Sequence, residues 1–575
     1  MLQLYRFLKP YRLSVAAVFA LVFLLTMSEL YLPTLMADIV DIGIVNRDVG
    51  YIVRIGGWML VIAGLGTICS VSVSYLAARN AVGLGKILRQ QVFTKVESFS
   101  LHEIDKFGTA TLITRTTNDI NQVQTVTFMI QRMMIMAPIM CIGGIIMAVS
   151  QDRHLSLIFM MVIPILAAII GLVMSKAIPL FRLMQLKIDK LNLVVREGLT
   201  GIRVIRAFNR IDRESVRFEE ANADLMQNAI KVNRLMATLM PTMILVMNFT
   251  LIAIIWFGSV RIDRGQMQVG ALMAFIQYSM QIMISLIMVS FMFIMVPRAS
   301  ASAVRINEVL NTETEIQDPQ IHKQNEPSRG VVEFKDVTFI FPGAEQPAIS
   351  NISFTARPGQ ITAIIGGTGS GKSALVSLIP RFYDVDEGVV LIDGIDVKAM
   401  TQENLRSQIG LVPQKTVLFT GTIADNIRFG QAEASDEEVR KAAETAQALE
   451  FIQEMKDGFD SVIEQGGINV SGGQKQRLSI ARALVRGAKI YIFDDSFSAL
   501  DFKTDARLRA ALRRETTGSS VLIVGQRVAA VMDADQIIVL EEGRIAGLGN
   551  HRELMESCEV YREIVYSQLS EEELA

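Results

Sequence analysis

Six long apolar stretches in the first half of the 575-residue chain set the strongest limit on its fold. A bilayer core of ~30 Å is crossed by about 20 residues of helix, and each stretch reaches that length. We therefore expect six membrane-spanning helices. They are placed near residues 13–33, 52–78, 127–149, 155–178, 236–260 and 268–296.

The distribution of positive charge predicts how these spans are oriented. The N-terminus and the segments 80–126 and 179–235 are rich in Lys and Arg, whereas the other three connections are short and hold few. Basic loops face the cytoplasm, which predicts a multi-pass protein of the plasma membrane with both termini inside the cell. The first span also lacks a small-residue cleavage site, which favours a retained anchor over a signal peptide.

The two long cytoplasmic segments have helical patterning and few turn residues. Helices that continue for ~20 residues past the membrane would project about 30 Å beyond it. Each segment is therefore expected to form two helical extensions joined by a short connector, near Ser100–Phe107 and near Phe208–Ser215. We expect these connectors to contact the soluble half; the alternative is that they are solvated loops.

Polar residues are rare inside the spans, where charge is costly and usually faces a cavity or a partner. Glu29 is a candidate for a substrate cavity, whereas Arg132, next to Gln131, could instead extend to the membrane interface. Methionines are frequent in the last two spans and suit a tolerant cavity, although any one of them could face lipid or a helix. They are Met236, Met240, Met243, Met247, Met273, Met280, Met283, Met288, Met292 and Met295.

Composition separates the chain into a membrane half and a soluble half. Apolar residues make up 51% of the chain, and the net charge of −2 gives no sign of nucleic-acid binding. Cys69, Cys141 and Cys558 lack metal-ligand spacing and are interpreted as core residues. A polar linker with two prolines, 311–330, predicts a transmembrane domain over 1–310 and a soluble domain over 331–575.

The soluble half contains a phosphate-binding loop in its expected setting. Strand-like alternation begins at Val331, and a second apolar strand, Ile361 to Ile365, leads into the pattern G-x-x-x-x-G-K-[ST]. Backbone N–H groups of such a loop converge on phosphate oxygens, Lys372 would reach the β and γ phosphates, and Ser373 would ligate Mg²⁺. The loop consists of Gly366, Gly367, Thr368, Gly369, Ser370, Gly371, Lys372 and Ser373.

The end of another apolar strand, further along the chain, supplies carboxylates for the same site. Ile490 to Phe493 is followed by Asp494, which can hold Mg²⁺, and by Asp495. The position after the metal-binding aspartate normally carries the carboxylate that polarises the attacking water. An aspartate in place of glutamate withdraws that carboxylate by about 1 Å, and such a displacement can cost ~100-fold in rate.

These motifs together resemble those of the ABC transporters, and the whole chain resembles an exporter half-transporter. The resemblance rests on the phosphate loop, on Gln414 in GLVPQKTVLF, on Ser471-Gly472-Gly473-Gln474, on Asp494, on the SALD loop ending in Asp501, and on IVGQRVAAV. The membrane half matches through ITRTTNDI (Ile113 to Ile120) and GLTGIRVIRAF (Gly198 to Phe208). It implies a six-helix transmembrane domain with long cytoplasmic extensions, followed by an α/β P-loop nucleotide-binding domain.

The resemblance also implies roles for single residues and for a dimer. Phe341 would stack on the adenine of ATP, where the family usually has Tyr, and Gln414 would sense Mg²⁺ and the membrane arms. In the dimer, each phosphate loop would be capped by the signature of the other subunit. This chain's signature, Ser471–Gln474, would therefore cap the partner's phosphate loop. The arm connectors would dock on the soluble domains and transmit their closure to the membrane.

Two departures from the family pattern fall on one composite site. The family's catalytic glutamate is Asp495, and its switch histidine is Gln526, whose neutral amide cannot take up a proton. This pairing resembles the degenerate subunit of heterodimeric bacterial multidrug exporters. It predicts a partner half-transporter with Glu and His at these two positions, and a hydrophobic or amphiphilic substrate.

Three alternatives remain open at this point. A homodimeric lipid or peptide exporter with slow ATPase would also fit, because aspartate is still a carboxylate. An ATP-gated channel or regulatory subunit would bind nucleotide without pumping. An importer component fits less well, because the six spans precede the nucleotide-binding domain in one chain and carry long cytoplasmic arms.

Overall fold

The structure is a computed structural model that describes residues 1–319 and 329–568. The chain divides into two compact units, which we treat separately. The membrane unit comprises Met1–Glu97 and Ala110–Thr312, and the nucleotide unit comprises Ser98–Thr109 and Glu313–Ala575.

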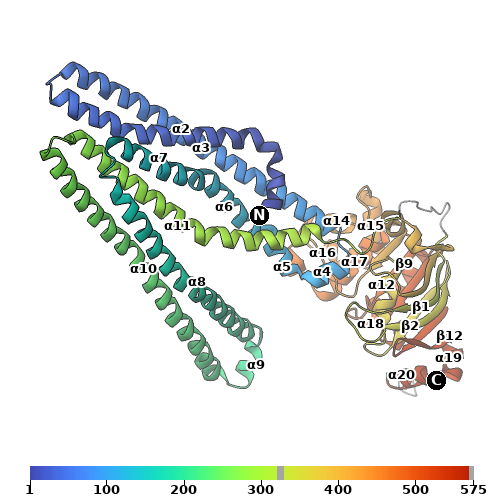
Figure 1. Cartoon of the computed structure of the whole chain (residues 1–575). Coiled ribbons are helices and arrows are strands. Elements are labelled where there is room, and N and C mark those ends of the chain that lie inside the picture. Colours follow the sequence, from blue (N-terminus) through green and yellow to red (C-terminus); the bar gives the residue numbers. More distant parts are fainter. Residues whose placement is uncertain (320–328, 569–575) are drawn as a thin grey trace. The chain divides into compact units, whose positions relative to one another are not determined.

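Six helical runs in the part of the chain that the structure describes are long and apolar enough to cross a membrane, as the sequence predicts (Figure 1). Each run overlaps one of the predicted spans. The first run ends in a π-helical turn, Ile39–Ile44, and the third contains two, Arg115–Asp119 and Ile130–Met134. The helices of this unit are α1 Leu2–Tyr5, α2 Arg12–Asp38, α3 Val49–Glu97, α5 Thr109–Thr114, α6 Ile120–Met129, α7 Ile135–Gln151, α8 Leu157–Thr200, α9 Ile202–Ala207, α10 Ile211–Asp263 and α11 Val269–Asn311.

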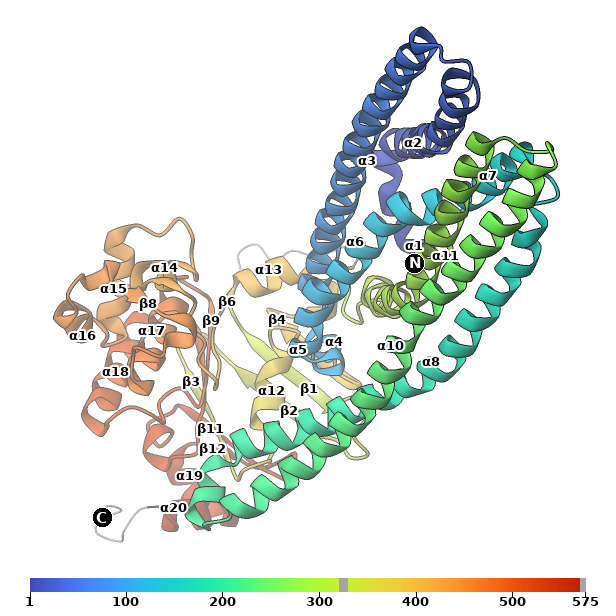
Figure 2. The same ribbon diagram turned by 90° about the vertical axis from the view of Figure 1, so that its left-hand side faces the viewer.

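The predicted helical extensions are present. Helix α10 has 53 residues and α8 has 44, more than twice what a bilayer requires. The two helices run side by side as an antiparallel pair in both ribbon views (Figures 1 and 2).

The first connector is the helix α4, Leu101–Phe107, within its predicted range, but the predicted range of the second connector was wrong. The chain turns at Gly201, forms α9 and turns again before α10 begins at Ile211, so Ile211–Ser215 is helical. The turn ends at Asn209, whose φ of 50° is a left-handed conformation that asparagine tolerates. Asp212 and Glu214 lie in the first turn of α10, where acidic residues favour a helix N-terminus.

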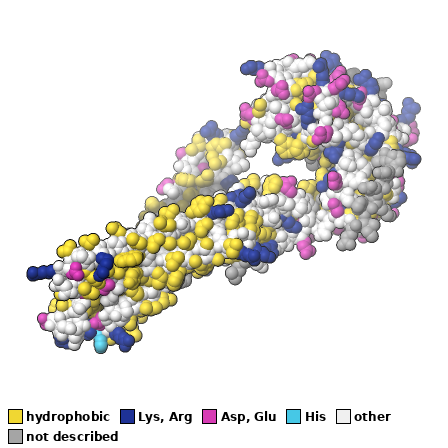
Figure 3. Space-filling view, turned by 90° about the horizontal axis from the view of Figure 1, so that it is seen from above, with side chains coloured by type: hydrophobic (Ala, Val, Ile, Leu, Met, Phe, Trp, Pro, Cys, Tyr) yellow, Lys and Arg dark blue, Asp and Glu magenta, His cyan; other side chains and the backbone are white. Residues whose placement is uncertain are grey.

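The spans expose apolar side chains along their length, which suits contact with lipid. Leu60, Met160 and Trp256 are 77%, 76% and 69% exposed. In Figure 3, apolar side chains cover the surface of the membrane spans that faces the viewer, and Lys and Arg gather towards the ends of the spans. A buried apolar cluster of this unit includes Phe159, Phe275 and Tyr278.

Small residues allow the helices to approach closely, as is common between membrane helices. A Cβ added to Gly143 would collide with the Leu30 side chain, and one added to Gly258 would collide with Leu272. The predicted methionine-rich region divides between two environments: Met243 and Met283 are 2% exposed, whereas Met240 is 49% exposed.

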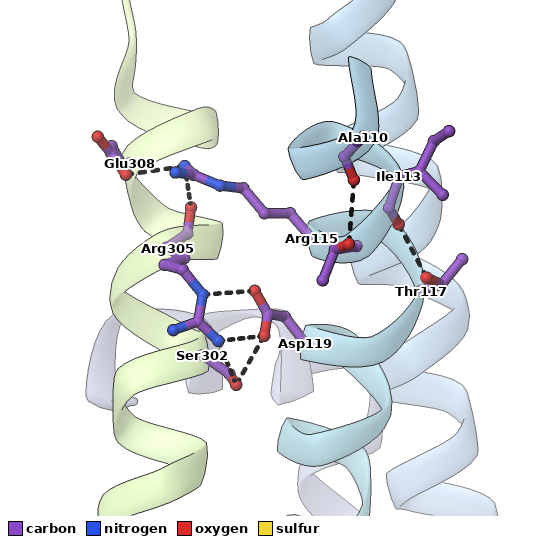
Figure 4. Close-up of polar contacts among 9 residues, drawn as sticks. Ala110, Ile113, Arg115, Thr117, Asp119, Ser302, Arg305 and Glu308 are labelled. Atoms are coloured by element: carbon purple, nitrogen blue, oxygen red, sulfur yellow. Dashed lines mark hydrogen bonds and ion pairs between the residues drawn. The ribbon is translucent and has the colours of Figure 1, made fainter. Parts of the chain in front are cut away.

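A network of charged side chains joins the π-helical turn Arg115–Asp119 to the end of α11 (Figure 4). The buried Asp119 carboxylate accepts hydrogen bonds from Arg305 Nε at 2.8 Å and from Ser302 Oγ at 2.9 Å. Arg115 Nη1 donates to Glu308 Oε2 at 2.8 Å and to the Arg305 carbonyl at 3.0 Å. The segment Ile113–Ile120, singled out in the sequence, is therefore fixed against the last helix of the unit.

The nucleotide unit is built on a six-stranded sheet in the order β12-β11-β3-β10-β9-β6. Its neighbours pair in parallel except β12, and all five residues of both β9 and β10 are buried, as is usual for parallel strands covered on both faces. The strands are β3 Ile361–Gly366, β6 Ile409–Val412, β9 Ile490–Asp494, β10 Ser520–Val524, β11 Gln536–Glu541 and β12 Arg544–Gly549.

A second, antiparallel sheet has the order β2-β1-β4-β5, and a two-stranded sheet pairs β7 with β8. Helices cover the sheets and form a helical region in which α14 and α15 pack on α17 (Figure 2). The strands are β1 Val332–Phe339, β2 Ile349–Ala356, β4 Glu387–Ile392, β5 Ile395–Asp396, β7 Gly421–Thr422 and β8 Val462–Ile463. The helices are α12 Lys372–Leu378, α13 Gln402–Ser407, α14 Ile423–Arg428, α15 Asp436–Thr445, α16 Leu449–Glu454, α17 Gly472–Leu484, α18 Phe502–Glu515, α19 His551–Ser557 and α20 Glu559–Tyr566.

The charge network gives a stability prediction. Arg305→Ala removes the cation that faces buried Asp119 and should lower the free energy of unfolding by about 3 kcal/mol, because an uncompensated buried charge remains. Thermal unfolding of the detergent-solubilised chain measures the loss. The double variant Asp119→Asn/Arg305→Ala should lose less than Arg305→Ala alone. An equal or larger loss in the double variant would contradict the role assigned to this pair.

Candidate functional site

Four neighbouring parallel strands bring the predicted site residues to one edge of the six-stranded sheet. The phosphate loop follows β3, and Gln526 follows β10. Asp494 ends β9, Asp495 comes directly after it, and Gln414 follows β6. In register, Val524 lies opposite both Ile364 and Asp494. Ligand sites of open α/β sheets form at the carboxyl ends of the strands, which is the edge these residues occupy.

The phosphate loop wraps around its own lysine. Lys372 is 8% exposed, and its Nζ donates to the carbonyls of Gly366 at 2.8 Å and Gly367 at 2.6 Å. Burial lowers the pKa of Lys372, although the nearby carboxylates Asp495 and Asp494 act in the opposite direction. The ammonium group is thus held at the mouth of the loop with neutral oxygens as its hydrogen-bond partners, and a phosphate would supply the negative charge.

Two glycines of the loop are required by its tight backbone path. A Cβ on Gly366 would collide with the Leu540 carbonyl, and Gly371 has a φ of 95°, which favours glycine. In contrast, no atom lies within 4 Å of a Cβ built on Gly367. The loop is therefore closed towards the sheet and open at Gly367, as expected for a cradle whose N–H groups receive phosphate oxygens.

The structure places two candidate metal ligands together. Ser373 Oγ, at the start of α12, lies 3.3 Å from Asp494 Oδ1. Burial raises the pKa of Asp494, and Asp495 adds to the rise, whereas Ser373 and Lys372 act against it. A hydroxyl and a carboxylate oxygen at this spacing suit Mg²⁺, which prefers oxygen ligands and is held in such sites by one or two protein groups plus phosphate. The residues present therefore fit MgATP, with Lys372 facing phosphate and Ser373 and Asp494 facing the metal.

Asp495 is held at the site by its backbone. Its N–H donates to the Val524 carbonyl at 3.0 Å, and its own carbonyl accepts from Ser498 Oγ at 3.0 Å. Its φ of 45° is left-handed, which aspartate tolerates better than most residues. The side chain is half-buried beside Asp494, at the position where the sequence predicts the water-polarising carboxylate.

Gln414 and Gln526 have exposed side chains at the same edge. The Gln526 carbonyl accepts a hydrogen bond from Gln568 Nε2 at 2.8 Å, and Gln568 Oε1 accepts from the Val528 N–H at 2.9 Å. The loop after β10 is thus attached to the residues that follow α20. No hydrogen bond joins the Gln526 side chain to another residue within 1–319 and 329–568.

The aromatic position predicted for adenine stacking lies just beyond β1. Phe341 is 40% exposed and makes edge contacts with Phe339 and Tyr383, at ring-centroid distances of 4.9 and 5.5 Å. A cavity of about 320 Å³ opens beside these rings, and Ser100 and His102 near the start of α4 line its other side. Burial raises the pKa of Tyr383, whose hydroxyl lies 3.5 Å from Asp105.

The signature residues form a separate surface. Ser471 caps α17 through a capping box with Gln474: the Ser471 N–H donates to Gln474 Oε1 at 2.9 Å, and Ser471 Oγ accepts from the Gln474 N–H at 3.3 Å. Ser471 and Gly472 are exposed, so the helix N-terminus can receive an anion from outside the chain. Asp501 caps α18 through Thr504. Among the residues that the structure describes, the hydrogen bonds of Ser471 and Gln474 do not reach the phosphate loop.

One buried carboxylate beside the cavity was not singled out in the sequence. Glu103 is 3% exposed and accepts hydrogen bonds from both the N–H and the hydroxyl of Ser100, at 2.7 Å each. The spacing Ser-x-x-Glu in SLHE is a capping-box pattern that could have indicated the start of α4. Its additional contact with Glu315, described below, has no sequence signal.

Comparison with known proteins decides the family. Residues 15–286 match the ABC transporter transmembrane region, and residues 349–498 match the family described as ABC transporter. An uncharacterised ABC transporter ATP-binding protein of Mycobacterium tuberculosis is 44% identical over 565 residues, which cover 98% of this chain and 97% of the relative. The chain belongs to the ABC transporters. It is a half-transporter of the exporter type, with membrane spans that precede one nucleotide-binding domain.

Two further matches are a curated relative and a solved structure. An ATP-dependent lipid A-core flippase of Chromobacterium violaceum is 30% identical over 549 residues, covering 95% of this chain and 93% of the relative. The structure of a bacterial Atm1-family ABC exporter with ATP bound superimposes with a TM-score of 0.82 at 24% identity, covering 97% of this chain and 99% of the other, and supports the fold alone. The predicted fold class and family are confirmed, and the chain is a multi-pass membrane protein of an ATPase-coupled transporter.

The metal pair predicts a pH-dependent response. MgATP should raise the melting temperature of the wild-type chain, and Asp494→Asn should abolish the part of the rise that requires Mg²⁺. Because a metal ligand must lose its proton and the pKa of Asp494 is raised, Mg²⁺ affinity should fall on acidification at a higher pH than for an ordinary aspartate. Thermal shift at graded Mg²⁺ and pH measures both effects. A full Mg²⁺-dependent shift in Asp494→Asn would exclude Asp494 as a ligand.

Proposed function

We propose that this chain is the degenerate subunit of a heterodimeric ABC exporter that moves hydrophobic or amphiphilic compounds out of the cell. The chain would bind MgATP in a slowly hydrolysing site made of its own phosphate loop and its partner's signature. Its own signature, Ser471–Gln474, would complete a competent site on the partner. The nucleotide domain and both termini would lie in the cytoplasm, because the long segments between spans on that side carry the positive charge.

The observation that supports this proposal best is the placement of Asp495 and Gln526. They follow β9 and β10, which are adjacent strands whose ends are in register at Asp494 and Val524. Both departures therefore weaken the same composite site. Asp495 carries a shortened carboxylate, and Gln526 can neither accept a proton nor carry charge. Two changes at one site are more easily explained by specialisation than by independent drift.

The other nucleotide-binding motifs of the family are intact in this chain. Lys372, Ser373 and Asp494 fit MgATP, and Gln414 is exposed at the same edge. Ser471 and Gly472 expose the N-terminus of α17, a surface suited to a γ-phosphate presented by another subunit. ATP bound at the two composite sites would close the nucleotide domains and favour an outward-facing cavity. Hydrolysis and product release at the competent site would reset it.

The principal alternative is a homodimeric exporter of lipid. It is favoured by the relative that is described as a lipid A-core flippase and by the capacity of Asp495 to act, slowly, as a carboxylate base. The two assemblies differ in what the chain can do by itself. Rapid ATPase and transport by the purified chain alone would exclude the heterodimer, whereas ATPase that requires a second half-transporter would exclude the homodimer.

Restoring the family residues should restore hydrolysis. In a complex whose partner site is silenced by changing its catalytic glutamate to glutamine, the double variant Asp495→Glu/Gln526→His should raise the residual ATPase by about tenfold or more, because ~1 Å of misplacement is removed. Steady-state phosphate release measures the gain. Gln414→Glu in the same background is a control that adds a carboxylate elsewhere at the site. No increase in the double variant would show that this site is slow for another reason.

Removing the carboxylate should have little effect on the intact complex. Asp495→Asn should leave most of the ATPase of the assembled transporter, whereas the equivalent change of the partner's catalytic glutamate should nearly abolish it. The reason is that the competent site uses only this chain's signature. Parallel ATPase assays of the two complexes measure the difference, and near-total loss in Asp495→Asn would contradict the proposed division of labour.

Glu29 gives a prediction on the substrate. It lies on α2 one heptad after Val22 and four residues after Leu25, both buried, so it shares their interior stripe. The Nε2 of Gln281, on α11, donates a hydrogen bond to the backbone carbonyl of Glu29 at 3.2 Å. Glu29→Gln should raise the KM for a lipophilic cation such as tetraphenylphosphonium about fivefold, since ~1 kcal/mol of charge attraction is lost. Transport of a neutral dye such as Nile red by the same vesicles is the control, and equal effects on both would contradict the prediction.

A further inference from the structure

The chain passes between its two units at three places, and two segments near these places meet within the nucleotide unit. Ser98–Thr109, which contains α4, belongs to the nucleotide unit although α3 precedes it and most of α5 follows it in the membrane unit. The segment from Glu313 to Pro319 follows α11 and belongs to the nucleotide unit as well. The covalent chain connects the two units at these segments.

The buried carboxylate of Glu103 links the two segments. One of its oxygens accepts from the N–H and the hydroxyl of Ser100, and the other accepts from the Glu315 N–H at 3.1 Å. Burial pushes the pKa of Glu103 upwards, but the hydrogen bonds from Ser100 and Glu315 outweigh it and hold the pKa below its ordinary value. Glu103 therefore stays charged at neutral pH although it is 3% exposed.

The linker on the other side of this contact is also fixed. Ile316 is 5% exposed, and the Asp318 carboxylate accepts from the Gln402 N–H at 2.9 Å, at the start of α13. The linker is thus attached to α4 before Ile316 and to the sheet-covering helix α13 after it. The cavity of about 320 Å³ next to Phe341 is bounded by Ser100 and Glu315, so this attachment lies beside the loop proposed to hold adenine.

We propose that Glu103 is a positioning residue that joins the connector α4 to the interdomain linker. Through it, a movement of the nucleotide unit would be delivered together to the arms α3 and α5, on either side of α4, and to α11, which ends four residues before Glu315. The proposal rests on the proposed function in one respect, since it takes ATP-driven closure as the movement to be transmitted. It is independent of which compound is transported.

The third hydrogen bond of Glu103 is what distinguishes this role from capping. The two bonds with Ser100 complete the N-terminal cap of α4, and a capping box works with Gln as well as with Glu. The bond to Glu315 leaves α4 and spans 212 residues of sequence. A buried ionised carboxylate needs all its donors, so loss of the Glu315 N–H should be felt at α4.

The test separates nucleotide binding from the response of the membrane unit. Glu103→Gln keeps a capping residue but removes the charge, and Glu315→Pro removes the donating N–H. Glu315→Ala, which keeps that N–H, and Glu313→Pro are matched controls; Thr312, which precedes residue 313, already has the extended φ and ψ of −66° and 121° that a following proline requires.

Each variant is assembled with its partner subunit in lipid nanodiscs and titrated with MgATP. The readout is the fluorescence of Trp58 and Trp256, the two tryptophans of this chain, which lie in α3 and α10. The same complex with Trp58→Phe/Trp256→Phe supplies the partner's signal for subtraction. In Glu103→Gln and Glu315→Pro the amplitude should fall about fivefold or more, while the half-saturating MgATP concentration changes by less than about twofold.

The controls should keep the wild-type amplitude. Full amplitude in Glu103→Gln or in Glu315→Pro would overturn the proposal, and so would an equal loss in Glu313→Pro or a parallel loss of MgATP affinity. A wild-type complex whose tryptophans do not respond to MgATP would overturn it too. A complex that shows the expected fluorescence pattern but transports nothing would refute the proposed export function and leave the role of Glu103 standing.

Discussion

The parallel pairing of β3, β10 and β9 is the constraint on which the site depends. Its register sets Ile364, Val524 and Asp494 at one level, so the three loops that follow emerge side by side. The phosphate loop, Gln526 and Asp495 are therefore brought to the same edge of the sheet, as the proposed composite site requires. In the proposed site, a substitution in any of these loops would act on the same nucleotide.

Burial leaves two charged groups of this site without the opposite charges that would stabilise them. Lys372 has a lowered pKa and Asp494 a raised one, which means that burial disfavours the charged form of each. The lysine lacks a direct carboxylate partner among its hydrogen bonds, and Asp494 faces the Ser373 hydroxyl. A polyanion with a divalent cation supplies the missing opposite charge to both groups at once. Binding of ATP and Mg²⁺ is therefore expected to be mutually dependent at this site.

Features with a local or periodic cause could be predicted from the sequence. The spans follow from apolar length, the strands at Ile361 and Ile490 from buried runs, and the phosphate loop from glycines placed where the backbone is tight. What failed or was missed has one local and one long-range cause. The second connector ends earlier than predicted because Asn209 turns the chain, and Glu103 meets Glu315 only because the fold brings the linker back onto α4. Neither feature leaves a periodic pattern or a distinctive composition in the sequence from which it could be predicted.

In the proposed heterodimer, the local structure gives a reason why this chain would keep its signature and lose its catalytic side chains. Ser471 and Gln474 cap α17 for this chain's own benefit, so replacing them would cost stability whatever the partner needs, by about 1 kcal/mol for a typical cap. Asp495 and Gln526 are different, because the hydrogen bonds described for them are made by their backbone atoms. The hydrogen bonds described for these two residues would therefore survive a change of side chain, although the left-handed φ of 45° at Asp495 favours residues that tolerate that conformation. Catalytic decay is then expected at Asp495 and Gln526 before it is expected in the signature.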